Sequence, residues 1–228
     1  MVTLITGGSG ALGQAVTRRF LASGDTVYVP YIVDAEREQL QAAVKPEQAG
    51  RLVLERLDVG DAAAFGQFVD AARGRHGRVD ALVTLVGGFA GGGLLETDRA
   101  AWDKMLDLNL TTVFTAARAV VPHMVAARRG RVVTIGSRAV VPPAGGFIGY
   151  TVAKAGVIAF TLALAQELQS TGVTANCVLP STMDTPANRA AMPDSDRKGW
   201  VPVDSVATAI TFLASEDAAH VSGALVTV

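Results

Sequence analysis

The feature that most constrains the fold is a regular alternation of short β-branched runs and longer helix-like stretches along the whole chain. Most of the short runs are almost continuously apolar, as expected for parallel strands buried on both faces. Seven strands are predicted, at Val2–Thr6, Thr26–Ile32, Leu52–Leu57, Ala81–Val86, Arg131–Ile135, Val173–Leu179 and Ala224–Val228. Helices are predicted between them, at residues 11–23, 34–44, 61–75, 98–107, 109–129, 150–170 and 203–214. This alternation predicts a doubly wound α/β fold with a seven-stranded, mostly parallel sheet and helices on both faces.

No linker, low-complexity tract or composition break interrupts residues 1–228, so one domain is expected. The net charge of -1 argues against nucleic acid as a partner, which needs a concentrated basic surface. A basic cluster, Arg128, Arg129 and Arg131, lies at a predicted helix end, where cations are structurally favourable. The single cysteine, Cys177, lies in an apolar run and is interpreted as a buried small side chain in a protein of a reducing compartment.

Metal and membrane sites are not expected. The three histidines, His76, His123 and His220, show no metal-ligand spacing. The N-terminus enters a strand without the basic and apolar regions of a signal peptide. No apolar run approaches the length of a membrane span, so a cytoplasmic location is expected.

Two irregular segments interrupt the alternation and mark the expected ligand site. Gly87–Gly93 is rich in glycine and follows the fourth strand, whereas Ser181–Pro202 is rich in Pro, Asp and Ser and follows the sixth. Ligands of open α/β sheets bind at the carboxyl ends of the strands. We therefore expect both segments to open onto that edge, with Met183–Trp200 as a lid over the substrate pocket.

A glycine-rich turn, Thr6–Gly13, joins the first strand to the first helix. Glycines allow backbone N–H groups to approach a pyrophosphate at the positive end of a helix, as in Rossmann-type domains. The predicted phosphate-binding residues are Gly7, Ser9, Gly10, Ala11, Leu12 and Gly13. A tight turn without a ligand is the alternative for such a loop considered alone.

The end of the second strand should meet the adenosine ribose of a dinucleotide. An acid there selects NAD and a base selects NADP, but Pro30–Val33 contains neither, and Tyr31 is the predicted contact. Asp34 follows and is interpreted as a helix N-cap. Arg37 could reach a phosphate or could be a solvated helix charge. The missing acid favours NADP(H).

The third predicted strand ends at the same edge of the sheet, and Asp58 and Val59 follow it. We expect these two residues to contact the adenine of the cofactor. Asp58 also suits the start of a helix, which is the structural alternative.

Four polar residues form the predicted catalytic site: Asn109, Ser137, Tyr150 and Lys154. Tyr150 and Lys154 are four positions apart and share a helix face, so the ammonium is expected to lower the pKa of the phenol. Ser137 would hold a substrate oxygen by a hydrogen bond. Asn109, at the predicted start of a helix, would hold the geometry of that helix or a proton-relaying water. Each residue alone has an ordinary explanation as a cap, turn or helix-surface residue, but together they indicate carbonyl chemistry.

These motifs resemble the short-chain dehydrogenase/reductase family over essentially the whole chain. The loop TGGSGALG is similar to the family's TGxxxGxG, with Ala11 at the middle glycine, and Asn109, Ser137, Tyr150 and Lys154 match its tetrad. Leu85–Gly88 departs from the family's Asn-Asn-Ala-Gly motif.

The resemblance implies a role for each motif. Tyr150 would donate the proton, Lys154 would also bind the nicotinamide ribose, and Thr185 would hold the carboxamide. Further cofactor contacts are implied at Val86, Gly87, Gly88, Pro180 and Met183. The substrate would be a small carbonyl or alcohol compound. Homo-oligomers, dimers or tetramers, would form through the predicted helices at 109–129 and 150–170.

Two alternatives remain. The segments Val86–Gly92 and Leu179–Trp200 are also similar to the quinonoid dihydropteridine reductases of the same superfamily, and Phe89 and Trp200 could stack on a flat ring such as a pterin. Trp200 could instead anchor the lid to the core. A dinucleotide-binding redox sensor without catalysis is the other alternative, although Tyr150 and Lys154 are both present.

Overall fold

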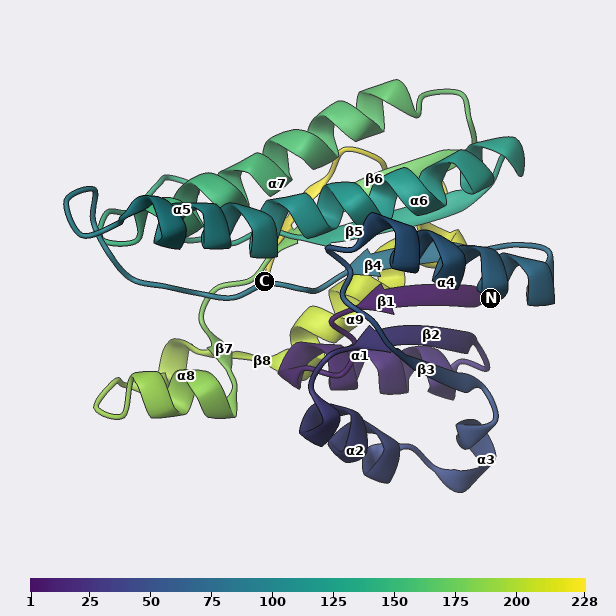
Figure 1. The fold of residues 1–228 in the computed structure, drawn as a ribbon, viewed down its shortest axis with the longest axis horizontal. Coiled ribbons are helices and arrows are strands. Elements are labelled where there is room, and N and C mark those ends of the chain that lie inside the picture. The colour runs from purple at the N-terminus through teal and green to yellow at the C-terminus, as the bar shows by residue number, and fades with distance from the viewer.

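Seven strands form one sheet at the centre of the computed structural model, which describes residues 1–228 (Figure 1). The spatial order is β3-β2-β1-β4-β5-β6-β9, and every neighbouring pair is parallel. The strands are β1 (Val2–Thr6), β2 (Thr26–Tyr31), β3 (Leu52–Arg56), β4 (Ala81–Thr84), β5 (Gly130–Ile135), β6 (Val173–Leu179) and β9 (Leu225–Thr227). The predicted fold class is confirmed, and the sheet is parallel throughout.

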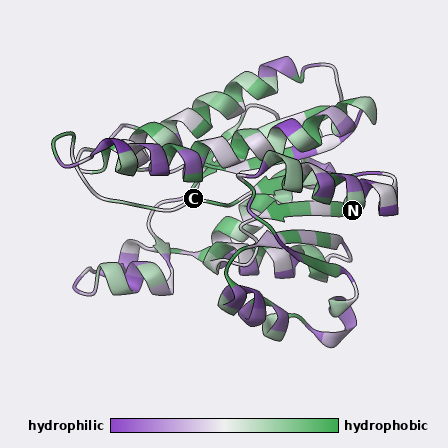
Figure 2. Cartoon of the chain, viewed as in Figure 1, coloured by the Kyte–Doolittle hydropathy of each residue, from purple (hydrophilic) through white to green (hydrophobic).

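Helices cover both faces of the sheet and bury it in two apolar layers (Figure 2). One face carries α1 (Ala11–Ala22), α2 (Asp34–Ala43) and α9 (Val203–Leu213). The other carries α4 (Ala62–His76), α5 (Arg99–Leu106), α6 (Thr112–Ala126) and α7 (Ile148–Glu167). Val16, Leu40 and Ile210 are fully buried in the first layer, and Phe65 and Val120 are fully buried in the second.

The predicted break between two helices at residue 108 is wrong. Asp107–Thr111 forms a π-helical turn that joins α5 to α6 without interruption. The extra residue of a π-turn leaves the apolar pattern out of phase, which explains why the pattern indicated two separate helices.

Short elements were not predicted, because a few residues carry too little periodicity. One is α3 (Pro46–Ala49). A second is the 3-10 turn at Glu216–Ala218, and the predicted lid region contains the others: β7 (Met183–Asp184), α8 (Pro186–Ala191), a 3-10 turn at Arg197–Gly199 and β8 (Val201–Pro202). Strands β7 and β8 pair with each other, and with α8 they project from one end of the domain (Figure 1).

The statement that no apolar run reaches membrane-span length needs correction. Helix α7 has 20 residues and a mean hydropathy of 1.6, which would suffice by length and composition. In the structure it packs against β5, β6 and α5, and Ala153, Val157 and Thr161 are fully buried there. One face of the helix therefore packs into the core, whereas about a third of its apolar window is buried in total.

The cysteine is buried as expected, whereas the basic cluster makes structural contacts other than the expected one with a helix end, since α6 ends at Ala126 and Arg131 lies in β5. Arg129 lies 2.9 Å from Glu216, and the buried Arg131 donates to the backbone oxygen of Ser215 at 3.2 Å. Cys177 is fully buried in β6.

The order in which strands are added to the sheet reverses between β1 and β4, and the site lies at this point. The chain winds outward from β1 towards β3 and from β4 towards β9. Thr6 pairs with Thr84, and the Leu85 N–H donates to the Thr6 oxygen at 2.9 Å, so both strands end at one level. The loops after them diverge to opposite faces and leave a crevice, as the topology predicts.

Candidate active site

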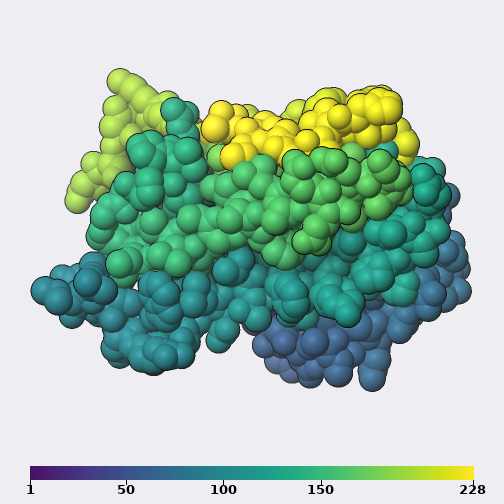
Figure 3. Space-filling view, turned by 90° about the horizontal axis from the view of Figure 1, so that it is seen from above, coloured from purple at the N-terminus to yellow at the C-terminus, as the bar shows by residue number.

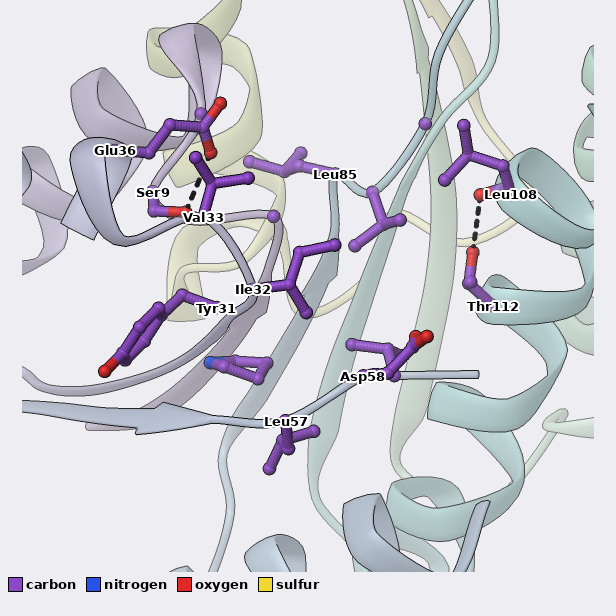
Figure 4. Close-up of a pocket in the computed structure, with 16 residues that line it drawn as sticks. Ser9, Tyr31, Ile32, Val33, Glu36, Leu57, Asp58, Leu85, Leu108 and Thr112 are labelled. Atoms are coloured by element: carbon purple, nitrogen blue, oxygen red, sulfur yellow. Dashed lines mark hydrogen bonds between the residues drawn. The ribbon is translucent and has the colours of Figure 1, made fainter. Parts of the chain in front are cut away.

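A cavity of about 320 Å³ opens at this crevice (Figure 4). Loops after β1, β2, β3 and β4 form its walls, together with the π-turn and the start of α6. The lining residues are Gly7, Ser9, Gly10, Pro30, Tyr31, Ile32, Val33, Glu36, Leu57, Asp58, Val59, Leu85, Val86, Gly87, Leu108 and Thr112. Most of the predicted cofactor residues before position 88 are thus brought together in one place.

The glycine-rich loop has the tight geometry that a phosphate loop needs. Gly7 has φ +69°, and a Cβ there would lie 2.7 Å from the backbone of Leu85. A Cβ at Gly13 would collide with the backbone of Gly7 and Gly8. Both positions therefore require glycine.

The start of α1 explains the departure at the middle glycine. Gly10 is the N-cap of α1 and brings no side chain to the end of the helix, so the first backbone N–H groups are free of a side-chain cap. Ala11 is the first helical residue and is exposed, so its methyl group has room. A helix N-terminus of this kind favours a phosphate group.

Asn109 lies in the π-turn and does not open a helix, which corrects the sequence-based prediction. It is fully buried, and its side chain binds the loop after β4: Oδ1 accepts from the Gly88 N–H at 3.1 Å, and Nδ2 donates to the Gly88 oxygen at 3.0 Å. Nδ2 also donates to the Met105 oxygen at 3.1 Å. Asn109 therefore holds the loop through its backbone, which suits a loop that lacks the family's asparagines.

Gly87 lies where the predicted catalytic residues meet the cofactor cavity. A Cβ at this position would lie 2.7 Å from Asn109 Oδ1 and 3.3 Å from Lys154 Nζ. The structure thus brings Asn109 and Lys154 together at the inner end of the cavity, and only glycine fits between them.

Lys154 is buried in α7 with 6% of its surface exposed. Its Nζ donates to the Ile135 oxygen, at the end of β5, at 3.0 Å. Burial lowers the pKa of Lys154 to about 8, because a low-dielectric environment disfavours the ammonium. The side chain is held in one position and still carries a proton at neutral pH.

Tyr150 lies one turn before Lys154, and the pKa of its phenol does not follow our expectation. Burial raises the pKa of Tyr150, and the Ser137 hydroxyl opposes that rise by hydrogen bonding. Lys154 is not among the causes. The expected lowering of the Tyr150 pKa by the ammonium is therefore wrong, because removal of the phenol from water is the larger effect.

Ser137 follows β5, is buried, and accepts a hydrogen bond from the Ala139 N–H at 3.2 Å. Ser137 and the Lys154 ammonium thus both lie at the carboxyl end of β5, which is the edge of the sheet at which the cavity opens. A serine and a protonated tyrosine side by side can hold one oxygen atom and deliver a proton to it.

Two phenylalanines surround Tyr150. The ring centroid of Phe89 lies 5.1 Å from that of Tyr150, and the centroid of Phe147 lies 6.1 Å from it. Phe89 remains 66% exposed. Phe147 was not singled out from the sequence. The other predicted substrate residue, Trp200, lies at the end of the 3-10 turn with the Arg197 guanidinium 5.7 Å from its ring centroid.

The segment after β6 is anchored at Thr185. This residue is buried, and its Oγ1 accepts from the Asn188 N–H at 3.2 Å as the N-cap of α8. Asn188 also donates to the Met183 oxygen at 2.8 Å, and Pro180 accepts from the Arg138 N–H at 3.0 Å. These contacts give the predicted cofactor residues of this segment defined positions beside the carboxyl end of β6.

The adenosine end of the cavity holds a residue that the sequence reasoning missed. Glu36 lines the cavity, and the Ser9 hydroxyl donates to its Oε2 at 3.2 Å. The predicted N-cap role of Asp34 is wrong, because Asp34 is the first residue of α2 and Val33 takes the cap position. An acid three residues inside the true cap was the signal that could have identified Glu36.

Comparisons with known proteins agree with this geometry. The profile of the short chain dehydrogenase family matches residues 1–196. The chain is 35% identical to BbsD of Thauera aromatica, a hydroxy(phenyl)methylsuccinyl-CoA dehydrogenase subunit, over 97% of this chain and 92% of the relative. It is 32% identical to the 3-oxoacyl-(acyl-carrier-protein) reductase FabG of Escherichia coli, over 97% and 93%. Levodione reductase has a similar structure, with a TM-score of 0.91 and 27% identity over 100% of this chain and 95% of the other.

Proposed function

Because the chain belongs to the short-chain dehydrogenase/reductase family, and is thus an NAD(P)-dependent oxidoreductase, we propose that Tyr150, Ser137 and Lys154 interconvert a small carbonyl compound and its alcohol. The observation that carries this proposal is the buried Lys154 ammonium, which is bound to the end of β5 beside the cofactor cavity, one helical turn after Tyr150. Lys154 Nζ lies by Gly87, which lines the cavity.

Each residue has a defined task in the reductive direction. A bound nicotinamide supplies or accepts the hydride. The Ser137 hydroxyl orients the carbonyl oxygen, and the Tyr150 phenol gives its proton to that oxygen. Burial raises the pKa of Tyr150, so the phenol is protonated at neutral pH and ready to donate. Asn109 acts indirectly, by holding the loop at Gly88 against the catalytic helix.

The cavity fits a dinucleotide by its shape and polar groups. The glycine loop and the free start of α1 suit a pyrophosphate, and Asp58 and Val59 line the wall assigned to the adenine. The expectation of NADP(H) rests on the missing acid at the end of β2. ElxO, whose solved structure has NADP bound, has a similar fold at 23% identity and a TM-score of 0.92. The Glu36 carboxylate, which lines the cavity, favours NAD(H) instead.

The substrate side favours a carbonyl compound with a flat apolar group. Phe89 and Phe147 lie beside Tyr150, and their centroids are 5.6 Å apart, so a ring or a planar chain could pack against them while its oxygen reaches the phenol. The name of BbsD includes a phenyl group, and that of LinX of Sphingobium indicum a dichlorocyclohexadiene diol. A quinonoid dihydropterin is the competing flat substrate.

A homo-oligomer and a cytoplasmic location complete the proposal. Phe114 of α6 and Val152 and Leu162 of α7 are apolar side chains that remain 54%, 40% and 36% exposed. Figure 3 shows α7 lying across one side of the molecule next to the C-terminal segment, where it could meet a second copy. The single cysteine, buried and unpaired, suits the reducing cytoplasm.

The test is a panel of ring-bearing ketones, aliphatic ketones, 3-oxoacyl thioesters and quinonoid dihydropterin, each with NADH and NADPH. Tyr150→Phe is expected to lower kcat/KM about 100- to 10,000-fold, as loss of a general acid does, and to leave dinucleotide affinity within about twofold. Tyr28→Phe is the matched control, because its hydroxyl contacts His76 at 2.9 Å, far from Ser137. Unchanged turnover in Tyr150→Phe would refute the assigned role, and tight dinucleotide binding without any turnover would favour the sensor.

A further inference from the structure

An acid occupies the adenosine end of the cavity, although the strand that leads there ends without one. Glu36 belongs to the first turn of α2 and is half-buried. Its Oε2 accepts from the hydroxyl of Ser9, which is only 3% exposed. Figure 4 shows this contact next to Val33, on the wall where the glycine loop meets the end of β2. The helix after β2 thus supplies the carboxylate that the strand lacks.

No base lines the cavity to balance this charge. Glu36 and Asp58 are the charged residues among those that line it, and Lys, Arg and His are absent from the set. A second phosphate at the ribose 2′ position would therefore be placed close to carboxylates, in a site partly removed from water. Like charges in such a place repel each other strongly.

Two arginines lie near this end of the cavity without lining it, and both have acidic or polar partners. The Arg37 guanidinium lies over the Tyr31 ring, 5.8 Å from its centroid, and donates to Gln41 and Glu38 at 3.0 Å each. Arg56 is in register with Tyr31 at the end of β3, is exposed, and lies 4.0 Å from the Asp34 carboxylate. Arg37 is thus held at the rim by partners on its own helix, and it is the residue to compare with Glu36.

We propose that Glu36 makes this site selective for NAD(H) over NADP(H). The inference rests on the proposed function, since it assumes that a dinucleotide occupies the cavity. The carboxylate would accept a hydrogen bond from the ribose 2′-hydroxyl of NAD and would repel the 2′-phosphate of NADP. The preference for NADP(H) expected from Pro30–Val33 is thereby reversed, because the acid comes from the following helix. NAD⁺ is expected to bind at least about tenfold more tightly than NADP⁺.

The test is equilibrium binding of NAD⁺ and NADP⁺, without substrate, by titration calorimetry of the wild type, Glu36→Gln and Arg37→Gln. Glutamine keeps an acceptor for the Ser9 hydroxyl, so the loop contact is preserved while the charge is removed. The quantity compared is the affinity for NAD⁺ divided by the affinity for NADP⁺. We expect Glu36→Gln to lower this ratio by about tenfold and Arg37→Gln to leave it within about twofold. The preference of the wild type for NAD⁺ should also fall with added salt, and that of Glu36→Gln should fall less, because salt screens charge repulsion and only Asp58 then remains in the cavity.

Each contrary result has a separate meaning. Tighter binding of NADP⁺ to the wild type, or an unchanged ratio in Glu36→Gln, would overturn the inference and leave the proposed function intact. Loss of NADP⁺ affinity in Arg37→Gln alone would assign the selectivity to Arg37 and overturn it too. Failure of both dinucleotides to bind any variant would contradict the proposed function itself.

Discussion

The two ends of the site are built in different ways. The cofactor end is formed by backbone and by buried groups: Gly7 and Gly13 have no room for a Cβ, and Ser9 is almost fully buried. The substrate end is formed in part by side chains that reach solvent, such as Phe89 at 66% exposure. A tightly packed backbone can hold one ligand in one way, whereas exposed side chains can change without disturbing the fold. Cofactor binding should therefore be sensitive to small changes, and substrate choice should be tolerant of them.

The sharpest test of this contrast is Gly13→Ala. Its Cβ would collide with the backbone of Gly7 and Gly8, so the loop must move away from its phosphate-binding shape. We expect the affinity for either dinucleotide, measured by calorimetry, to fall about 100-fold, with a loss of about 2 kcal/mol in the free energy of unfolding by urea. The control is Gly10→Ala, where the new Cβ would lie 3.5 Å from Gly7 O and should cost no more than about 1 kcal/mol. Wild-type binding by Gly13→Ala would show that the loop does not depend on backbone packing.

A second test removes the link between the two ends. Asn109→Ala deletes the three hydrogen bonds to Gly88 and Met105 and leaves buried backbone groups without partners. The free energy of unfolding should fall by about 2 kcal/mol, and kcat/KM should fall by about 30-fold, because the loop between cofactor and substrate is released. Thr111→Ala in the same π-turn is the control, since its hydroxyl meets only the exposed Asp107 side chain at 3.3 Å. Equal effects of the two variants would contradict the role of Asn109 as a loop anchor.

A third test uses pH. The pKa of Lys154 is lowered to about 8, so its ammonium is present below that pH and is lost above it. If the charged form is required, kcat/KM should fall about tenfold per pH unit above about pH 8, since this parameter reports the free enzyme. Lys154→Arg keeps the charge at high pH and should remove this alkaline limb, whatever its absolute rate. A limb that persists unchanged in Lys154→Arg would have to belong to another group.

The smallest effect is expected at the substrate end. Phe89→Leu removes one aromatic contact with Tyr150 and should raise KM for a ring-bearing ketone about three- to tenfold, with little change in kcat for an aliphatic one. Dinucleotide affinity should stay the same. Leu95→Ala is the control, because its side chain is almost fully exposed. If Phe89→Leu weakens NAD⁺ binding instead, the two ends are not separate in the way proposed here.

The fold and much of the site were predictable from local patterns. Buried parallel strands such as Val173–Leu179 are continuous apolar runs, and the spacing of Tyr150 and Lys154 is a property of any helix. The glycine-rich loop was recognisable for the same reason, because its backbone geometry depends on a few adjacent residues. The boundaries of the longer elements match within about two residues at most ends.

Only the tertiary structure decided where the ionisable groups of the site lie, how their pKa values shift, and how α5 and α6 are joined. The π-turn that joins two helices at Asn109 places a fully buried side chain against Gly88. Glu36 lies in the cofactor cavity because α2 starts at Asp34 and turns it towards Ser9. The pKa of Tyr150 is raised because segments far apart in the chain exclude water from it. Sequence spacing determines which residues can share a face, whereas burial is the sum of contacts made by the whole fold.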